Sequence, residues 1–191
     1  MLKPVSAELI PAKTALHLAD LSLFQQVLLI TDGTLTNILE TYVGEKLHVI
    51  KIAEETRSEV DTDALWLLDL QPGSDLIERR IVLQGKVSRR NWLYAESLIA
   101  PERLEPGFRE RLTHSQEPIG KLWLEHKVET FKEITTTYQE PAGPLAPYFD
   151  IHPLDRLLCR TYRVLSQRRP IMLITEKFPA GYYTDAIGRG A

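Results

Sequence analysis

Two pairs of strand-length segments, each pair joined by a short polar loop, constrain the fold of this chain more strongly than any other feature of its sequence. The segments are residues 76–84 with 92–100, and residues 157–165 with 171–178. The connecting loops, 85–91 and 166–170, have the length of a hairpin, whereas a crossover between parallel strands needs a dozen or more residues. The sequence therefore predicts that each pair forms an antiparallel hairpin.

Helices and further strands are expected around these hairpins. A Thr-Asp-Gly-Thr segment at 31–34 separates two helical stretches and offers caps for the second, which Gly44 closes. The elements expected, in chain order, are helices at 21–29 and 35–40, a strand at 47–53, a polar loop at 54–63, a short helix at 106–112, a helical turn at 119–124 and a strand at 126–138. This order predicts an α+β fold with one antiparallel sheet and helices on one side of it.

The size and composition of the chain fit one domain. It has 191 residues, of which 43% are hydrophobic and 26% charged, and this is enough to bury one substantial core. No internal repeat or low-complexity segment divides the sequence. We therefore expect residues 1–191 to form a single domain, with the Gly-containing end at 185–191 frayed.

Charge and cysteine content argue against several classes of partner. The net charge is −3 and the 23 Lys and Arg residues are spread along the chain, which argues against a nucleic-acid partner. No apolar run approaches the ~20 residues of a membrane span and the N-terminus lacks a leader-like pattern, so we expect no membrane insertion and a cytoplasmic location. The single cysteine, Cys159, fits a reducing compartment. Nothing in the sequence indicates the oligomeric state.

Two charged residues interrupt the apolar side of their strands. Alternate side chains of a strand point to opposite faces of a sheet. Arg79 shares its parity with three aliphatic residues in segment 76–84, and Glu176 shares its parity with three apolar residues in segment 171–178. A charge that faces a core is costly unless it is paired or liganded, so the two residues indicate either one shared pocket or one ion pair.

Structural explanations account for the same pattern. A buried salt bridge without function, or a strand register displaced by one residue, would produce the parity of Arg79 and Glu176 equally well. Glu96 and Arg160 show the pattern more weakly, and an edge-exposed or structurally paired charge explains each of them. Arg160 is kept as a candidate ligand-binding residue.

Familiar catalytic motifs are absent or incomplete. Residues 30–35 resemble the phosphatase motif of the haloacid dehalogenase superfamily, but Ile30 stands where the nucleophilic Asp is needed, so a helix cap explains Asp32 and Thr34. The five histidines lack metal-ligand spacing, and no glycine-rich nucleotide loop or nucleophile elbow occurs. Cys159 lies inside a strand pattern and is expected to be a small core residue. We therefore expect neither a metal nor a nucleotide cofactor.

Five segments occur in an order and spacing typical of one enzyme family. They are 28–36 (Leu-Leu-Ile-Thr-Asp-Gly-Thr-Leu-Thr), 78–83 (Glu-Arg-Arg-Ile-Val-Leu), 94–101, 118–122 and 168–179. Through them most of the chain resembles the chorismate pyruvate-lyase family, in its branch from cyanobacteria, plastids, archaea and actinobacteria.

The resemblance implies a fold and a site. The fold is α+β, with a six-stranded antiparallel sheet and a ligand buried beneath helical flaps. As catalytic residues, Arg79 would bind the ring carboxylate of the ligand and Glu176 would lie at its ring hydroxyl. Backbone groups at Leu35 on one flap, and at Ile119 and Gly120 on another, would complete the substrate site.

Two positions depart from the best-known members of the family. Leu35 replaces a Met, a change expected to alter packing more than chemistry because both side chains are apolar. The loop at 86–91 is longer than the corresponding turn, so the resemblance does not define the entrance to the pocket.

The implied activity is a cofactor-free lyase reaction that removes pyruvate from chorismate and leaves 4-hydroxybenzoate, a precursor for quinones or phenolic lipids. The planar guanidinium of Arg79 suits bidentate carboxylate recognition. Glu176 would donate a proton near the ether oxygen, accept a hydrogen bond from the developing phenol, or only orient the substrate. Two other functions stay open.

The first is a non-enzymatic sensor of aromatic acids, because the same fold serves as the effector domain of some transcription regulators. The residues ahead of the first expected helix are too few for a DNA-binding helix-turn-helix. The second is a lyase or hydrolase that acts on a related aromatic precursor. The sequence does not distinguish such a precursor from chorismate.

Overall fold

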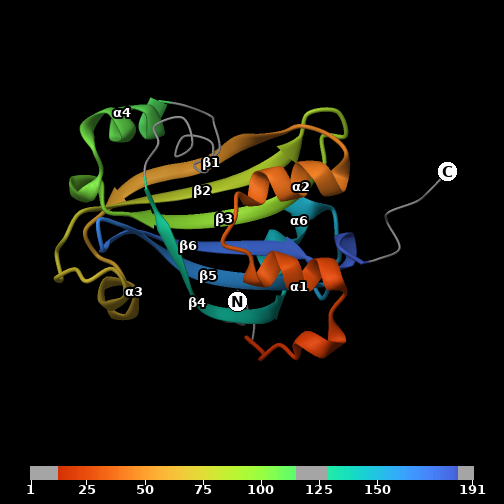
Figure 1. Cartoon of the computed structure of the whole chain (residues 1–191). Coiled ribbons are helices and arrows are strands. Elements are labelled where there is room, and N and C mark those ends of the chain that lie inside the picture. The colour runs from red at the N-terminus through yellow and green to blue at the C-terminus, as the bar shows by residue number, and fades with distance from the viewer. Residues whose placement is uncertain (1–12, 115–128, 185–191) are drawn as a thin grey trace, which may run out of the picture.

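A six-stranded antiparallel sheet, ordered β1-β2-β3-β6-β5-β4, forms the centre of the structure, a computed structural model that describes residues 13–114 and 129–184 (Figure 1). The strands are β1 (Leu47–Arg57), β2 (Leu76–Gly85), β3 (Asn91–Ile99), β4 (Phe131–Pro141), β5 (Arg156–Ser166) and β6 (Arg169–Pro179). The helices are α1 (Leu23–Ile30), α2 (Leu35–Val43), α3 (Thr62–Leu67), α4 (Pro106–His114) and α6 (Ala146–Phe149). Short 3₁₀ helices are η1 (Leu18–Asp20), η2 (Pro101–Arg103), η3 (Gly143–Leu145) and η4 (Ala180–Tyr182). The expected six-stranded antiparallel sheet is confirmed.

Both expected hairpins are present, and their edges join in the middle of the sheet. Strands β2 and β3 pair antiparallel, as do β5 and β6, and β3 pairs with β6. In the turn between β5 and β6, Gln167 and Arg168 both have positive φ angles, 49° and 65°. Two consecutive residues of this kind match the twist of the strands that they connect. The arrangement places β3 and β6 at the centre, where side chains are shielded from both edges.

The three longest helices pack on one face of the sheet, here called the inner face, which carries Arg79, Arg160 and Glu176. Helices α1 and α2 bury Leu28, Leu29 and Leu39 against this face. A capping box at Ser22 starts α1, and Gly44, with a φ of 74°, ends α2 in the left-handed conformation. Helix α4 places Phe108 over the other end of the same face.

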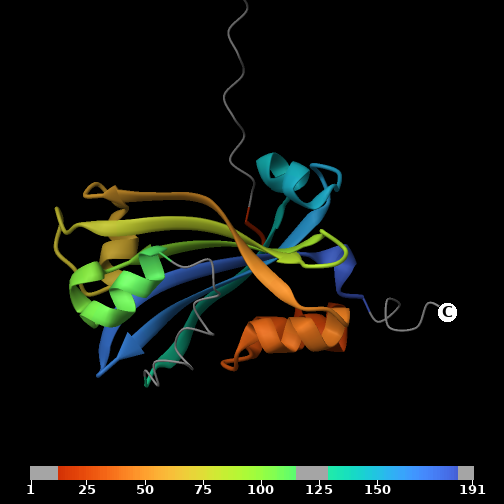
Figure 2. The same ribbon diagram turned by 90° about the horizontal axis from the view of Figure 1, so that it is seen from above.

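The opposite, outer face carries the two short helices. Helix α6 packs over Val82 and Tyr94 at one end, and α3 packs over Leu98 and Leu173 at the other. Figure 2 shows α1 and α2 on one side of the sheet and α6 on the other. The three longest helices therefore lie on one side of the sheet, as expected. The two short helices lie on the other side because both ends of the outer face are apolar and must be covered.

The expected polar loop at 54–63 was wrong in its first part, because β1 continues to Arg57. The polar residues there form ion pairs with the neighbouring strand, β2. Arg57 Nε lies 2.6 Å from a Glu78 carboxylate oxygen, and Arg80 Nη2 lies 3.3 Å from a carboxylate oxygen of Glu55. Charge complementarity therefore supports a strand that has too few apolar residues to show the usual alternation.

Several expectations fall outside the described residues. They are the helical turn at 119–124, the first residues of the strand expected at 126–138 and the frayed end at 185–191. Among the described helices, none is long and apolar enough to cross a membrane.

The left-handed end of α2 gives a test of stability with a matched control. A Cβ added at Gly44 would meet no heavy atom within 4 Å, so Gly44→Ala tests backbone strain alone and should lower the free energy of unfolding by about 1 kcal/mol. Gly107, in α4, has equally open space without a positive φ, so Gly107→Ala should raise stability by roughly 0.5 kcal/mol. Urea unfolding of both variants measures this, and a shift of the same sign in both would contradict it.

Candidate functional site

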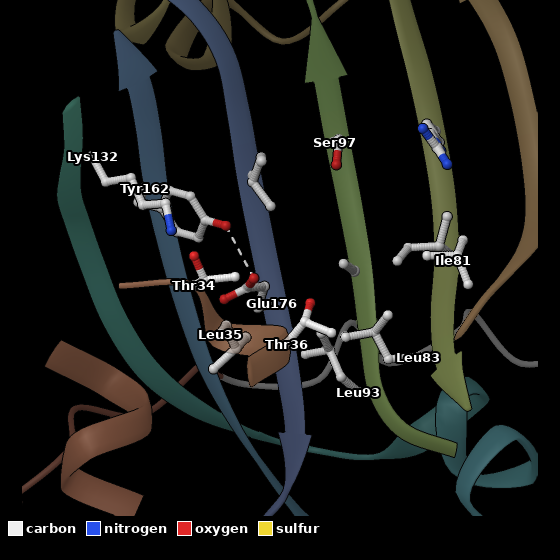
Figure 3. Close-up of a pocket in the computed structure, with 14 residues that line it drawn as sticks. Thr34, Leu35, Thr36, Ile81, Leu83, Leu93, Ser97, Lys132, Tyr162 and Glu176 are labelled. Atoms are coloured by element: carbon white, nitrogen blue, oxygen red, sulfur yellow. Dashed lines mark hydrogen bonds between the residues drawn. The ribbon is translucent and has the colours of Figure 1, made fainter. Parts of the chain in front are cut away.

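A pocket lies between the inner face of the sheet and the first residues of α2 (Figure 3). Its apolar wall consists of Leu35, Val49, Ile81, Leu83, Leu93, Ala95 and Ile174. Its polar and charged lining consists of Thr34, Thr36, Arg79, Ser97, Lys132, Tyr162 and Glu176. An apolar cavity with a few converging polar groups is the usual form of a small-molecule site.

The strand register explains why these side chains meet. Arg79 on β2 pairs with Ser97 on β3, which places both in one row across the inner face. One row along, Ala95 on β3 pairs with Glu176 on β6, and Glu176 pairs with Arg160 on β5. Strands β2 and β6 are separated by two strand spacings, about 10 Å. The pocket therefore has a guanidinium at one end, a carboxylate at the other, and an apolar floor between them.

Glu176 is held by two donors from the neighbouring strand. Its side chain is buried, with 6% of the residue exposed. Arg160 Nε donates to Oε2 at 2.6 Å, and the Tyr162 hydroxyl donates to Oε1 at 3.0 Å. Burial raises the pKa of Tyr162 well above its usual range, so the phenol stays protonated and remains a donor. Both oxygens of Glu176 therefore accept a hydrogen bond from a buried donor.

Arg79 reaches the same pocket with a different counter-ion. Arg79 is 1% exposed, and its Nε lies 3.7 Å from a carboxylate oxygen of Glu54 on β1. Burial lowers the pKa of the guanidinium and Glu54 opposes that shift, but an Arg keeps its proton under physiological conditions. Arg79 and Glu176 thus share one pocket, while each has an ion pair of its own. This decides between the two arrangements that their parity left open.

Arg160 faces inward, as its parity indicates, but lies behind Glu176. It is fully buried, and it contacts Glu176 without lining the pocket. A second donor of the same guanidinium, Nη1, bonds the backbone oxygen of Thr31 at 2.8 Å. Arg160 therefore connects the carboxylate of the site to the segment between α1 and α2.

The other residues singled out in the sequence have different positions. Leu35 lines the pocket at the first turn of α2. Ile119 and Gly120 lie outside the described residues. Glu96, on the outer face, lies 3.9 Å from Lys177 and is partly exposed, in agreement with the structural explanation. Cys159 is a fully buried core residue on the outer face, and burial raises the pKa of its thiol.

The helix cap expected from Asp32 and Thr34 is only partly present. Thr34 occupies the N-cap position of α2, but no side-chain hydrogen bond caps the helix there. The Thr31 hydroxyl instead accepts from the backbone nitrogen of Gly33 at 3.1 Å. Thr34 faces the pocket (Figure 3).

Several polar residues of the pocket were not identified from the sequence, among them Lys132 and Tyr162. Tyr162 has the parity of Arg160 on β5, two residues away, and that parity was the available signal. Lys132 and Ile134 lie on the inner face, but the register of β4 shifts between Ile134 and Thr136. Parity counted along the whole strand therefore places Lys132 on the outer face.

In comparisons of sequence, a family model and individual proteins match this chain under the same description. A family model described as chorismate pyruvate-lyase, Rv2949c-like, matches residues 29–184. The chain is 30% identical over 167 residues to a protein named chorismate pyruvate-lyase from Mycobacterium tuberculosis (strain H37Rv), a match that covers 84% of this chain and 82% of the relative. A protein of the same name from Mycobacterium leprae is 28% identical over 166 residues, covering 84% and 76%.

Solved structures share the fold at low sequence identity. The effector domain of PhnF from Mycobacterium smegmatis superposes with a TM-score of 0.62 at 15% identity, covering 80% of this chain and 92% of that one. The C-terminal domain of the histidine utilization repressor from Pseudomonas syringae pv. tomato gives a TM-score of 0.54 at 14% identity, covering 76% and 99%. At this identity the likeness shows the fold alone.

The ion pair of Glu176 predicts that replacing Arg160 lowers the stability of the protein more than replacing Arg163 on the same strand. Arg160→Met leaves a buried carboxylate without its ion partner and should lower the free energy of unfolding by roughly 3–5 kcal/mol. Arg163→Met, which removes the 2.8 Å contact to the half-exposed Glu133, should cost about 1 kcal/mol or less. Adding Glu176→Gln to Arg160→Met should recover part of the loss. Equal losses in the two single variants, measured by urea unfolding, would contradict this account.

Proposed function

This chain belongs to the Rv2949c-like chorismate pyruvate-lyase family, and on that premise we propose that it converts chorismate into 4-hydroxybenzoate and pyruvate. The observation that carries the proposal is the pocket itself. Arg79 and Glu176 line it from strands about 10 Å apart, with an apolar floor between them. A planar ring with an anion at one end and a hydroxyl at the other complements this arrangement.

Each end of the ligand has a matching group in the protein. Chorismate carries a carboxylate at C1 of its ring, an enolpyruvyl ether at C3 and a hydroxyl at C4. The guanidinium of Arg79 can bind the C1 carboxylate through two parallel hydrogen bonds, which strengthen where water is excluded. The carboxylate of Glu176 can accept a hydrogen bond from the C4 hydroxyl. The aliphatic side chains of β2, β3 and β6 would contact the faces of the ring.

The reaction is an elimination that makes the ring aromatic. The C3–O bond breaks and its electron pair stays with the departing enolpyruvyl oxygen. The C4 hydrogen leaves as a proton, and the electrons of the C4–H bond form the new C3–C4 double bond. When that proton is delivered to the methylene carbon of the departing group, the products are pyruvate and 4-hydroxybenzoate, and no oxidant or reductant is needed. Aromatisation supplies the driving force.

The contacts of Glu176 favour two of its three expected roles over the third, that of proton donor. Both of its oxygens already accept a hydrogen bond, from Arg160 and from Tyr162. These two donors hold the carboxyl group in place, and its oxygens retain lone pairs for the C4 hydroxyl. We assign Glu176 the role of acceptor and orienting group. The C4 proton then passes directly to the enolpyruvyl methylene, for which positioning is the main requirement.

The proposal is tested by incubating the purified protein with chorismate and measuring pyruvate and 4-hydroxybenzoate together. Equimolar products are expected from the wild type. Arg79→Ala should lower kcat/KM by roughly 100-fold or more through loss of carboxylate binding, and Arg79→Lys should not restore it. Arg80→Ala is the matched control, because Arg80 is the next residue of β2 and contacts Glu55 and Glu78 outside the pocket. It should retain activity within about threefold.

Three results would count against the proposal, and they differ in meaning. Full activity in Arg79→Ala would remove the site assignment while leaving the reaction intact. Binding of 4-hydroxybenzoate or chorismate without release of pyruvate would instead favour a sensor of aromatic acids. Release of a different product from a related precursor would favour the second alternative.

A further inference from the structure

Lys132 adds a second cation to the pocket, at the end where Glu176 lies. It is on β4, and its side chain lines the pocket together with Tyr162 and Glu176 (Figure 3). Its Nζ donates to the backbone oxygen of Gly33 at 2.8 Å and lies 5.7 Å from the centre of the Tyr162 ring. Because the Tyr162 hydroxyl bonds Glu176, the ammonium and the carboxylate border the same part of the cavity.

Lys132 places a largely buried positive charge at the edge of the cavity. Burial lowers the pKa of the ammonium, and the nearby carboxylates of Glu176 and Asp32 oppose this shift without cancelling it. Glu176 is already bonded to Arg160 at 2.6 Å, so much of its charge is neutralised from behind. A ligand carboxylate beside Lys132 could form a charge-assisted hydrogen bond with the ammonium, and such bonds are among the stronger polar contacts.

Substrate and product differ in the feature that this end of the pocket would recognise. Under the proposed function, on which this inference rests, the C1 carboxylate binds Arg79 and the C4 hydroxyl binds Glu176. The enolpyruvyl group is attached at C3, next to C4, so its carboxylate lies at the Glu176 end of the ligand. The product 4-hydroxybenzoate keeps the first carboxylate and lacks the second.

We propose that Lys132 binds the enolpyruvyl carboxylate, so that the pocket prefers the dianionic substrate to the monoanionic product. Arg79 then recognises what substrate and product share, and Lys132 recognises what the reaction removes. When the enolpyruvyl group leaves as pyruvate, the contact to Lys132 leaves with it. The product is held by fewer charged groups than the substrate was, which favours its release.

The test compares the affinity of one variant for two ligands. Lys132→Met keeps an unbranched side chain and removes the charge. The KM for chorismate should rise roughly 10- to 100-fold, while the Kd for 4-hydroxybenzoate, measured by calorimetry, should stay within about threefold. Lys132→Arg keeps the charge and should restore part of the affinity for chorismate. Lys46→Met is the control, because Lys46 is exposed and paired with Glu40. It should change neither the KM for chorismate nor the Kd for 4-hydroxybenzoate.

The outcomes separate a recognition role from a structural one. Equal weakening of both ligands by Lys132→Met would show that the residue supports the pocket in general, and an unchanged KM for chorismate would show that it does not meet the second carboxylate. Either result overturns the inference. If the wild type binds chorismate without converting it, the proposed function fails, and the Kd for chorismate replaces KM in the same comparison of variants. Retained binding of 4-hydroxybenzoate shows that the variant is folded.

Discussion

The buried ion pair between Glu176 and Arg160 is the interaction on which the rest of the site depends. Moving two charges out of water is expensive, and only close geometry with further hydrogen bonds offsets that cost. Here the 2.6 Å contact is supplemented by Tyr162 on one side and by the backbone oxygen of Thr31 on the other. The pair therefore does two things: it fixes a carboxylate in an apolar cavity, and it ties the centre of the sheet to the segment that joins α1 and α2.

That segment closes the pocket through bonds to the two neighbouring strands. Arg160 on β5 bonds Thr31, and Lys132 on β4 bonds Gly33. Both donors also border Glu176, so the groups that hold the helical cover are next to the groups that would contact a ligand. Arg79 stands apart at the other end, balanced by Glu54 from β1. Under the proposed function, the separation of these two charged centres by aliphatic side chains would select a ring with a carboxylate at one end and a hydroxyl at the other.

Much of the fold and part of the candidate site followed from the sequence, and the limits have physical causes. Loop length predicted both hairpins, and strand parity placed Arg79, Glu176 and Arg160 on one face. Parity could not name their partners, because that requires the strand order: β3 lies between β2 and β6, so Arg79 and Glu176 do not adjoin. Lys132 was missed because the register of β4 shifts within the strand. The end of β1 was missed because cross-strand charge pairs, not apolar residues, hold it.

We propose Arg79 and Glu176 as the two ends of one ligand site, and a crystal structure with 4-hydroxybenzoate bound tests this most directly. The expected result is a product carboxylate paired with the Arg79 guanidinium at about 2.7–2.9 Å, with its hydroxyl donating to Glu176. The bonds from Arg160 and Tyr162 to Glu176 should remain in place. A product bound in the reverse orientation, or outside this pocket, would contradict the account.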